Sequence, residues 1–139
     1  MKKSLNILSL ILLLTFTLNS ATILANEIED EITEPKILAV TMHGDWCGKC
    51  KIMDPKLNSI KEEFKDTGIL FTLLDMTDEF TKSQAQMQAA LMGLQDLFQL
   101  HKGKTGYTVI IDAETGKELD RITHDLSEKE MKNKLKAFI

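Results

Sequence analysis

The sequence predicts an α/β fold built on one mixed four-stranded sheet, with helices on both faces. Short apolar, β-branched runs alternate with amphipathic helical patterns, and a tight turn joins the last two runs. Strands that alternate with helices pair in parallel through right-handed crossovers, whereas a closing hairpin adds an antiparallel edge. The 139 residues, 43% of them hydrophobic, suffice for one small domain.

The first predicted strand is "ILAVTM", residues 37–42, and a helix follows the cysteine motif after it. Apolar residues recur there at intervals of four, three and four: Met53, Leu57, Ile60 and Phe64. This spacing is typical of an amphipathic helix, which should end before Gly68. Pro55 lies inside the helix and should kink it, because proline lacks an N–H group.

The second predicted strand covers residues 69–75. The segment "MTDEFTKSQ" has the composition of a loop, and residues 83–101 have a helical pattern in which Gly93 is a possible break. One apolar stripe runs along this helix: Met87, Leu91, Leu94 and Phe98. We expect the stripe to pack against the sheet.

The last part of the chain predicts a hairpin and a final helix. Residues 107–112 form the third strand, "AETG" the turn, and residues 117–123 the fourth strand. Ser127 and Glu130 have the spacing of a capping box, which marks the start of a helix. The apolar face of that helix comprises Met131, Leu135 and Phe138.

Residues 1–25 have the pattern of a secretory signal peptide. Two lysines precede an apolar run over residues 5–18, and Ala25 is the expected residue before cleavage. The alternative is an uncleaved N-terminal membrane anchor, because residues 7–25 could just span a bilayer. We therefore expect an exported protein, periplasmic or otherwise extracytoplasmic.

Cleavage would leave an acidic leader, residues 26–36, before the folded domain at residues 37–139. Removing the two lysines of the signal peptide leaves 15 basic and 21 acidic residues, a net charge of −6. An acidic surface argues against nucleic acid as a partner. Export would also place the cysteines in an oxidising compartment.

The motif "DWCGKCK" holds both cysteines of the chain, Cys47 and Cys50. At a strand-to-helix junction, Cys47 should lie in the first helical turn, where free N–H groups and the helix dipole lower the pKa of a thiol. Lys49 and Lys51 should act in the same direction. Gly48 should leave Cys47 open to another protein's sulfur, and Cys50 lies within disulfide reach.

Two other roles compete with thiol–disulfide exchange. A structural bridge across two residues would stabilise the fold little, because it closes a very short loop. A metal site would use the two sulfurs as half of a four-ligand set, for which the chain offers His43, His101, His124 and carboxylates. The export signal and the position of the motif favour the redox hypothesis.

The strand "ILAVTM", the motif W-C-G-K-C, Pro55 and the segment "YTVIIDAETGKEL" together resemble the thioredoxin superfamily in its minimal form, over residues 37–139. The resemblance implies the sheet order two-one-three-four. It also implies that Cys47 is the nucleophile, that Cys50 is the resolving cysteine, and that Trp46 forms a flat surface beside them.

The resemblance and the export signal together predict an exported protein-disulfide oxidoreductase. We expect it to act on cysteine-containing extracytoplasmic proteins, without a cofactor, as a monomer recharged by a membrane redox partner. The C-G-K-C motif favours a reductase-like role by analogy. The alternative is a non-enzymatic module that holds copper or zinc through Cys47 and Cys50 for delivery.

The sequence departs from the family pattern near the cysteines. Tyr107, or Gly106 if the register slips by one residue, stands where the family places a cis-proline. Tyr107 could cover the disulfide and donate a hydrogen bond to the Cys47 sulfur, or it could pack as a strand residue against a helix. Thr41 replaces the family's buried aspartate, and His43 is the nearest titratable group, either a proton acceptor or a polar neighbour.

The connection over residues 76–106 is longer than in the family. Met87 and Met92 could extend a soft copper site together with a histidine. Methionines at helical spacing are usually core residues, so we expect packing, or at most a partner-binding groove.

Overall fold

The computed structural model describes residues 34–139 as one unit, so the predicted signal peptide lies outside the described residues, as does most of the acidic leader. The elements follow in this order: β1 (Ile37–His43), α2 (Gly48–Ile60), the 3₁₀ helix η1 (Lys61–Phe64), β2 (Ile69–Asp75), α3 (Glu79–Leu91), α4 (Gln95–His101), β3 (Tyr107–Asp112), β4 (Glu118–Thr123) and α5 (Glu128–Lys136). None of the helices in this described part is both long and apolar enough to cross a membrane.

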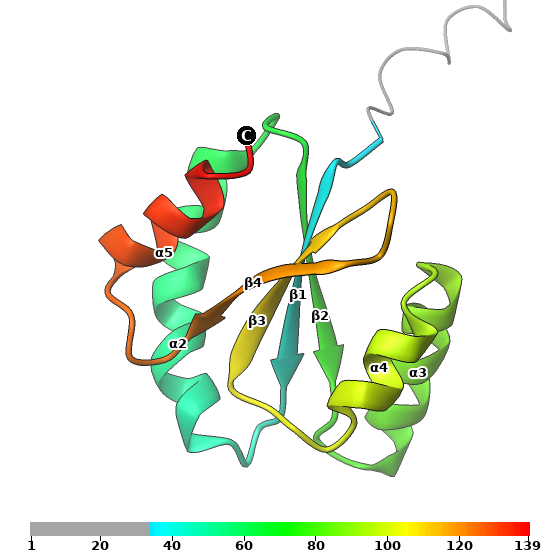
Figure 1. Ribbon diagram of the computed structural model, residues 1–139. Helices are drawn as coiled ribbons and strands as arrows, with labels where there is room; N and C mark the ends of the chain where they lie inside the picture. The colour runs from blue at the N-terminus through cyan, green and yellow to red at the C-terminus, as the bar shows by residue number, and fades with distance from the viewer. Residues whose placement is uncertain (1–33) are drawn as a thin grey trace, which may run out of the picture. The chain divides into compact units, whose positions relative to one another are not determined.

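The four strands form one sheet in the order β2-β1-β3-β4. The β1–β2 pair is parallel, whereas β1–β3 and β3–β4 are antiparallel. This topology confirms the predicted mixed sheet and its strand order. It also makes β1 an inner strand, so the residues that follow β1 leave the sheet near the middle of one of its ends (Figure 1).

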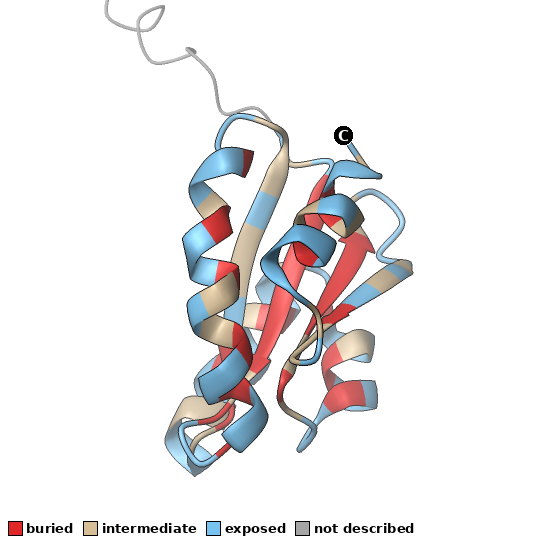
Figure 2. Ribbon diagram, turned by 90° about the vertical axis from the view of Figure 1, so that its left-hand side faces the viewer, coloured by how far each residue is buried: buried red, intermediate tan, exposed pale blue. Residues whose placement is uncertain are grey.

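Helices cover both faces of the sheet: α2 and α5 lie on one face, α3 and α4 on the other (Figure 1). Alternate residues of β1 supply the two cores, with Ile37 and Ala39 facing α2 and α5, and Leu38, Val40 and Met42 facing α3 and α4. Figure 2 shows buried residues gathered on the strands and on the inner sides of the helices. Each fully buried large aliphatic side chain contributes about 1.5–3 kcal/mol to folding.

Helix α2 buries the face that its spacing predicts. Met53, Leu57, Ile60 and Phe64 are each at most 1% exposed. The helix continues through Pro55 to Ile60 and then tightens into η1. The cysteine motif is therefore attached to a helix held firmly against the sheet.

The predicted loop "MTDEFTKSQ" is wrong in its second half, because α3 already begins at Glu79. Asp78 caps the helix: its carboxylate accepts from the Thr81 N–H at 2.8 Å, and the Thr81 hydroxyl accepts from the Asp78 N–H at 3.0 Å. This reciprocal pair satisfies free N–H groups at the helix start. The capping pair uses threonine where the usual pattern has glutamate or glutamine, so it is harder to recognise.

The predicted apolar stripe along residues 83–101 is wrong for its first two members. Met87 and Leu91 are 68% and 84% exposed, whereas Leu94 and Phe98 are buried. Helix α3 packs through Ala85 and Ala89 instead. The helical segment breaks at Gly93, whose φ of 71° suits glycine, and α4 continues in a new direction.

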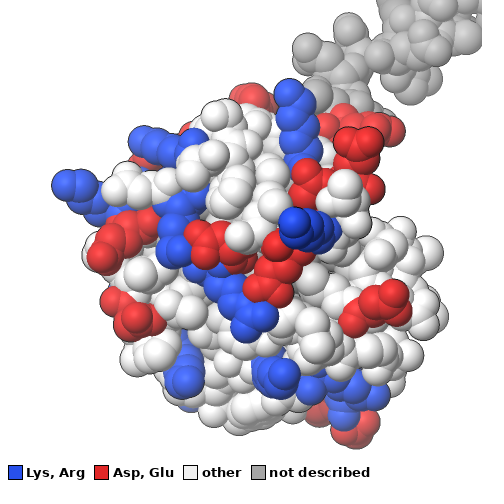
Figure 3. Space-filling view, in the orientation of Figure 1, with Lys and Arg blue, Asp and Glu red and all other residues white. Residues whose placement is uncertain are grey.

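The closing elements agree with the predictions. The hairpin joins β3 to β4, and Ser127 and Glu130 form the expected capping box at the start of α5. Met131 and Leu135 are fully buried, and Phe138 lies just past the helix, partly buried against the same core. Acidic and basic side chains are intermixed on the face drawn in Figure 3.

Candidate functional site

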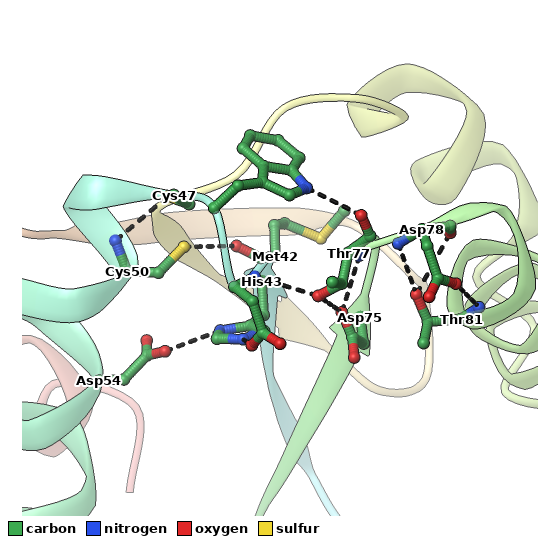
Figure 4. Close-up of polar contacts among 11 residues, drawn as sticks. Met42, His43, Cys47, Cys50, Asp54, Asp75, Thr77, Asp78 and Thr81 are labelled. Carbon is green, nitrogen blue, oxygen red and sulfur yellow. Dashed lines mark hydrogen bonds and ion pairs between the residues drawn. The ribbon is translucent and has the colours of Figure 1, made fainter.

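The two cysteines lie where β1 passes into α2. Cys47 is the N-cap residue of α2, one position before the predicted first turn, with an extended backbone at φ −82° and ψ 109°. The backbone N–H of Cys50 donates to the Cys47 sulfur at 3.1 Å (Figure 4). A sulfur in this position takes the place of the side-chain oxygen that usually caps a helix, so negative charge on it is stabilised.

The two thiols, both free, differ in burial. Cys47 retains 6% of its surface, whereas Cys50 retains none. The Cys50 thiol donates to the Met42 carbonyl at 3.8 Å, on the inner side of the loop. A disulfide-bearing partner can therefore approach Cys47 but not Cys50.

The pKa values of the two thiols are displaced in opposite directions. Burial opposes ionisation of Cys47, but hydrogen bonds from the side chains of Cys50 and Thr105 and from the backbone N–H groups of Cys50 and Lys49 lower its pKa below the ordinary cysteine value. Burial, reinforced by the hydrogen bond to Cys47, raises the pKa of Cys50 to about 11. Among the influences that lower the pKa of Cys47, the leading ones are hydrogen bonds rather than the charges of Lys49 and Lys51.

Trp46 and Gly48 are the chain neighbours of Cys47. The Trp46 ring is 59% exposed, and its indole N–H donates to the Thr77 carbonyl at 2.9 Å, which anchors the loop to the β2–α3 connection. A Cβ atom on Gly48 would meet nothing within 4 Å. Gly48 adds no side chain beside Cys47, which keeps a small exposed surface.

Gly106 faces the sulfurs across the site. Its φ is 90°, and its N–H donates to the Met42 carbonyl at 2.9 Å. A Cβ atom there would lie 2.6 Å from the Lys49 Cβ and 3.3 Å from the Cys47 sulfur. No cis peptide bond occurs in residues 34–139. Where the family places a cis-proline, this chain has a glycine with a positive φ.

Tyr107 does not face the cysteines, so its assignment to the family's cis-proline position is wrong, whereas its packing as a strand residue against a helix is confirmed. Its hydroxyl hydrogen-bonds to the His101 Nδ1 atom of α4 at 2.8 Å, and its ring packs with the core on that face of the sheet. Successive strand residues point to opposite faces, so once Gly106 faces the cysteines Tyr107 points the other way. The alternative register and the packing role are the ones observed.

His43 lies beside the motif with both ring nitrogens engaged. Its Nδ1 atom lies 2.8 Å from Asp54 and its Nε2 atom 3.1 Å from Asp45. Burial opposes protonation of His43, but the two carboxylates outweigh it, so its pKa is raised. Thr41, at the position of the family's buried aspartate, instead hydrogen-bonds to Thr108 at 2.9 Å within the core.

Within residues 34–139, no three or more His, Cys, Asp or Glu side chains converge as a metal site would require. Met87, which the sequence offered as a copper ligand, is exposed on α3.

The chain also matches known proteins. A family model described as thioredoxin matches residues 19–128. The chain belongs to the thioredoxin family. Within this family its matches are partial: it is 31% identical over 51 residues to Thioredoxin-T of Drosophila melanogaster, which covers 36% of this chain and 32% of that protein.

Other thioredoxins give similar values. Thioredoxin F, a chloroplastic protein of Oryza sativa subsp. japonica, is 38% identical over 45 residues, covering 32% of this chain and 23% of that protein. The chain thus spans about a third or less of these relatives. Among solved structures, a thioredoxin of Fasciola hepatica has 20% identity and a TM-score of 0.46, covering 86% of this chain and 94% of that one.

The structure brings together most of the residues that the sequence singled out. Six of them lie around the start of α2: Cys47, Cys50, Trp46, Gly48, Lys49 and His43. Tyr107 does not lie with them. Sequence reasoning missed Thr105, Thr77 and Asp54. Asp54 could have been found from the sequence, because it stands four residues after Cys50 in a predicted helix and so lies on the same helical face.

Proposed function

We propose that this chain is an exported thiol–disulfide oxidoreductase that exchanges disulfides with cysteine-containing extracytoplasmic proteins through Cys47 and Cys50. The observation that carries the proposal is the paired geometry of the two sulfurs. Cys47 accepts the Cys50 N–H at 3.1 Å at the tip of α2 and reaches the surface, while Cys50 is fully buried behind it.

The reaction follows in two steps. The Cys47 thiolate attacks one sulfur of a partner disulfide, and the partner's other sulfur leaves as a thiolate. Cys50 then loses its proton and attacks the Cys47 sulfur, and the partner's remaining sulfur leaves in turn. The partner gains two electrons and two protons, and the chain ends with a Cys47–Cys50 disulfide.

The difference in pKa between the thiols suits this order. Cys47 is the better entering group because its pKa is lowered, whereas the raised pKa of Cys50 keeps it protonated until the mixed disulfide forms. The exposed Trp46 ring beside Cys47 offers an apolar surface for the partner's chain. Thioredoxins among the relatives support the same chemistry.

Export and the identity of the partners belong to the proposal as well. The signal-peptide pattern of residues 1–25 supports an extracytoplasmic location. A chain that reduces partners there must be reduced again, so we propose a membrane redox partner. The chain acts as a monomer in a reductive direction.

Trapping tests the proposal directly. Cys50→Ser should accumulate mixed disulfides on Cys47 in cells, and these should disappear on reduction; Cys47→Ser is the matched control and should accumulate none. The wild-type protein should also reduce insulin disulfides in the presence of dithiothreitol. No trapped species with Cys50→Ser, together with tight stoichiometric binding of Cu(I) or zinc by the reduced protein, would overturn the proposal in favour of metal delivery.

A further inference from the structure

We propose that the Asp54 carboxylate accepts the Cys50 proton when Cys50 resolves the mixed disulfide, and that His43 holds this carboxylate in position. The inference rests on the function proposed above, because it concerns the second step of that reaction. Three features carry it: the placement of Asp54 on α2, the unpartnered oxygen of its carboxylate, and the absence of another free base beside Cys50 in the described residues.

Cys50 and Asp54 stand four residues apart on α2, so their side chains lie on the same face, one turn from each other. Figure 4 shows both side chains on the side of α2 that faces β1, near Met42 and His43. Asp54 is only 22% exposed, and Cys50 is fully buried. The carboxylate and the thiol therefore share one enclosed stretch of the α2–β1 interface.

Only half of the carboxylate is engaged. Its Oδ2 atom is held by His43 Nδ1 at 2.8 Å. Its Oδ1 atom is buried and has no hydrogen-bond partner among residues 34–139. Buried carboxylate oxygens normally have a donor, so an Oδ1 atom kept without one is well suited to receive a proton.

Other groups near Cys50 are poorly placed for this task. Thr41 and Thr108 bond to each other at 2.9 Å, and a hydroxyl is not a base at neutral pH. His43 is occupied on both nitrogens by Asp45 and Asp54. Asp45 is itself an exposed side chain on the far side of the histidine.

The charges around Cys50 favour transfer at the resolving step. Besides burial, the charges of Cys47 and Asp54 both disfavour the Cys50 thiolate. In the mixed disulfide the Cys47 sulfur carries no charge, so Asp54 is then the main negative group facing Cys50. Moving the proton to Asp54 neutralises that charge at the moment when the thiolate forms; His43, Asp45 and Asp75 are the other ionisable groups facing this region.

The step balances. The proton passes from the Cys50 sulfur to Asp54 Oδ1, directly or through one water molecule. A Cys50 electron pair forms the bond to the Cys47 sulfur, and the pair of the Cys47–partner bond leaves with the partner's sulfur. That thiolate then takes a proton from Asp54 or from solvent, which restores the carboxylate.

Reaction of the reduced protein with 5,5′-dithiobis(2-nitrobenzoate) separates the two steps. Cys47 releases the first thionitrobenzoate when it attacks, and Cys50 releases the second when it resolves the adduct. We expect Asp54→Asn to leave the first phase unchanged and to slow the second about tenfold or more, the size of a lost general base. In the variant, the second rate should rise with hydroxide concentration more steeply than in the wild type.

Glu62→Gln is the matched control. It removes the same charge from η1, the 3₁₀ helix that follows α2, twelve residues beyond Cys50 and so roughly 18 Å along the axis, and both phases should be unchanged. Equal second-phase rates in the wild type and Asp54→Asn would overturn the inference. Should Asp54→Asn fail to fold, the wild type carries the test: a second phase that is not slowed in D₂O would overturn it as well.

The same traces distinguish failure of the inference from failure of the proposed function. A wild-type protein that releases only one thionitrobenzoate, or reacts no faster than free cysteine, would contradict disulfide exchange itself. Two rapid releases that are indifferent to Asp54 would contradict only the role of this carboxylate.

Discussion

Gly106 and Cys47 approach each other so closely that a single methyl group on Gly106 would lie 3.3 Å from the Cys47 sulfur. The two residues are 59 positions apart in the chain, and the junction of β1 with α2 meets the start of β3 at this point. The contact means that the segment before β3 forms one wall of the site.

Gly106→Ala should therefore both destabilise the protein and lower the alkylation rate of Cys47. The positive φ costs an alanine about 1–2 kcal/mol, and the clash with Lys49 and Cys47 adds about 1–3 kcal/mol of overpacking. Chemical denaturation and the alkylation rate of Cys47 measure the two effects.

Gly103→Ala provides the matched control for this prediction. Gly103 also has a positive φ, 79°, but a Cβ atom there meets nothing within 4 Å. It should lose only the backbone part of the stability and keep the Cys47 rate. Equal losses in both variants would show that contact with the sulfur has no consequence.

The opposite pKa displacements predict separate alkylation profiles for the two thiols. The thiolate is the reactive form, so a lowered pKa keeps Cys47 reactive at pH values where an ordinary cysteine is protonated. Cys50 should react only as the pH approaches about 11. Iodoacetamide labelling between about pH 5 and pH 11, read residue by residue by mass spectrometry, would measure both profiles.

The unfolded protein in denaturant is the reference for these profiles, because both thiols should there titrate alike, near the ordinary value. A Cys47 profile that coincides with the unfolded one would contradict the stabilising geometry at the tip of α2.

Thr105 should tune the nucleophile. A hydrogen bond from its side chain is one of the influences that lower the pKa of Cys47. We expect Thr105→Val to slow Cys47 alkylation near neutral pH about threefold to tenfold, which corresponds to the typical net worth of one hydrogen bond. Thr105→Ser keeps the hydroxyl and should retain the wild-type rate; a slow serine variant would instead indicate a packing effect.

His43 predicts a pH-dependent contribution to folding. Its pKa is raised in the folded state, because its two carboxylate partners outweigh burial, so the stabilisation is fully present below the unfolded value of 6.5 and is lost as the pH rises through the folded value. Near pH 5.5 the free energy of unfolding of the wild type should exceed that of His43→Gln by about 1–3 kcal/mol, the range for charged hydrogen bonds. Urea denaturation at several pH values checks this; a difference that grows toward alkaline pH would have the wrong sign.

Much of the fold was accessible from hydrophobic periodicity. The central strands β1 and β3 are predictable from continuous apolar runs, because helices cover both faces of the sheet, and α2 is predictable from apolar residues at every third and fourth position. The region of α3 and α4 was predicted less well. Helix α3 contacts the sheet through the small residues Ala85 and Ala89, and the large apolar side chain of Leu91 is exposed. A prediction that assigns the largest apolar side chains to the core therefore selects the wrong face of α3.

The site divides in the same way. Cys47, Cys50 and Trp46 are adjacent in the chain, and one local motif identifies them. Gly106 and Thr105 enter the site through tertiary folding, and their facing depends on a single-residue choice of register, which sequence spacing leaves open. The consequence was the wrong placement of Tyr107.

The Met42 carbonyl is a shared acceptor, bonded both by the Gly106 N–H and by the Cys50 thiol. Oxidation removes the thiol hydrogen, so the same oxygen then serves one donor in place of two. The redox state of the two cysteines therefore changes the hydrogen bonding of the main chain at the wall where a partner would dock. Amide hydrogen exchange at Gly106 should differ between the oxidised and reduced forms.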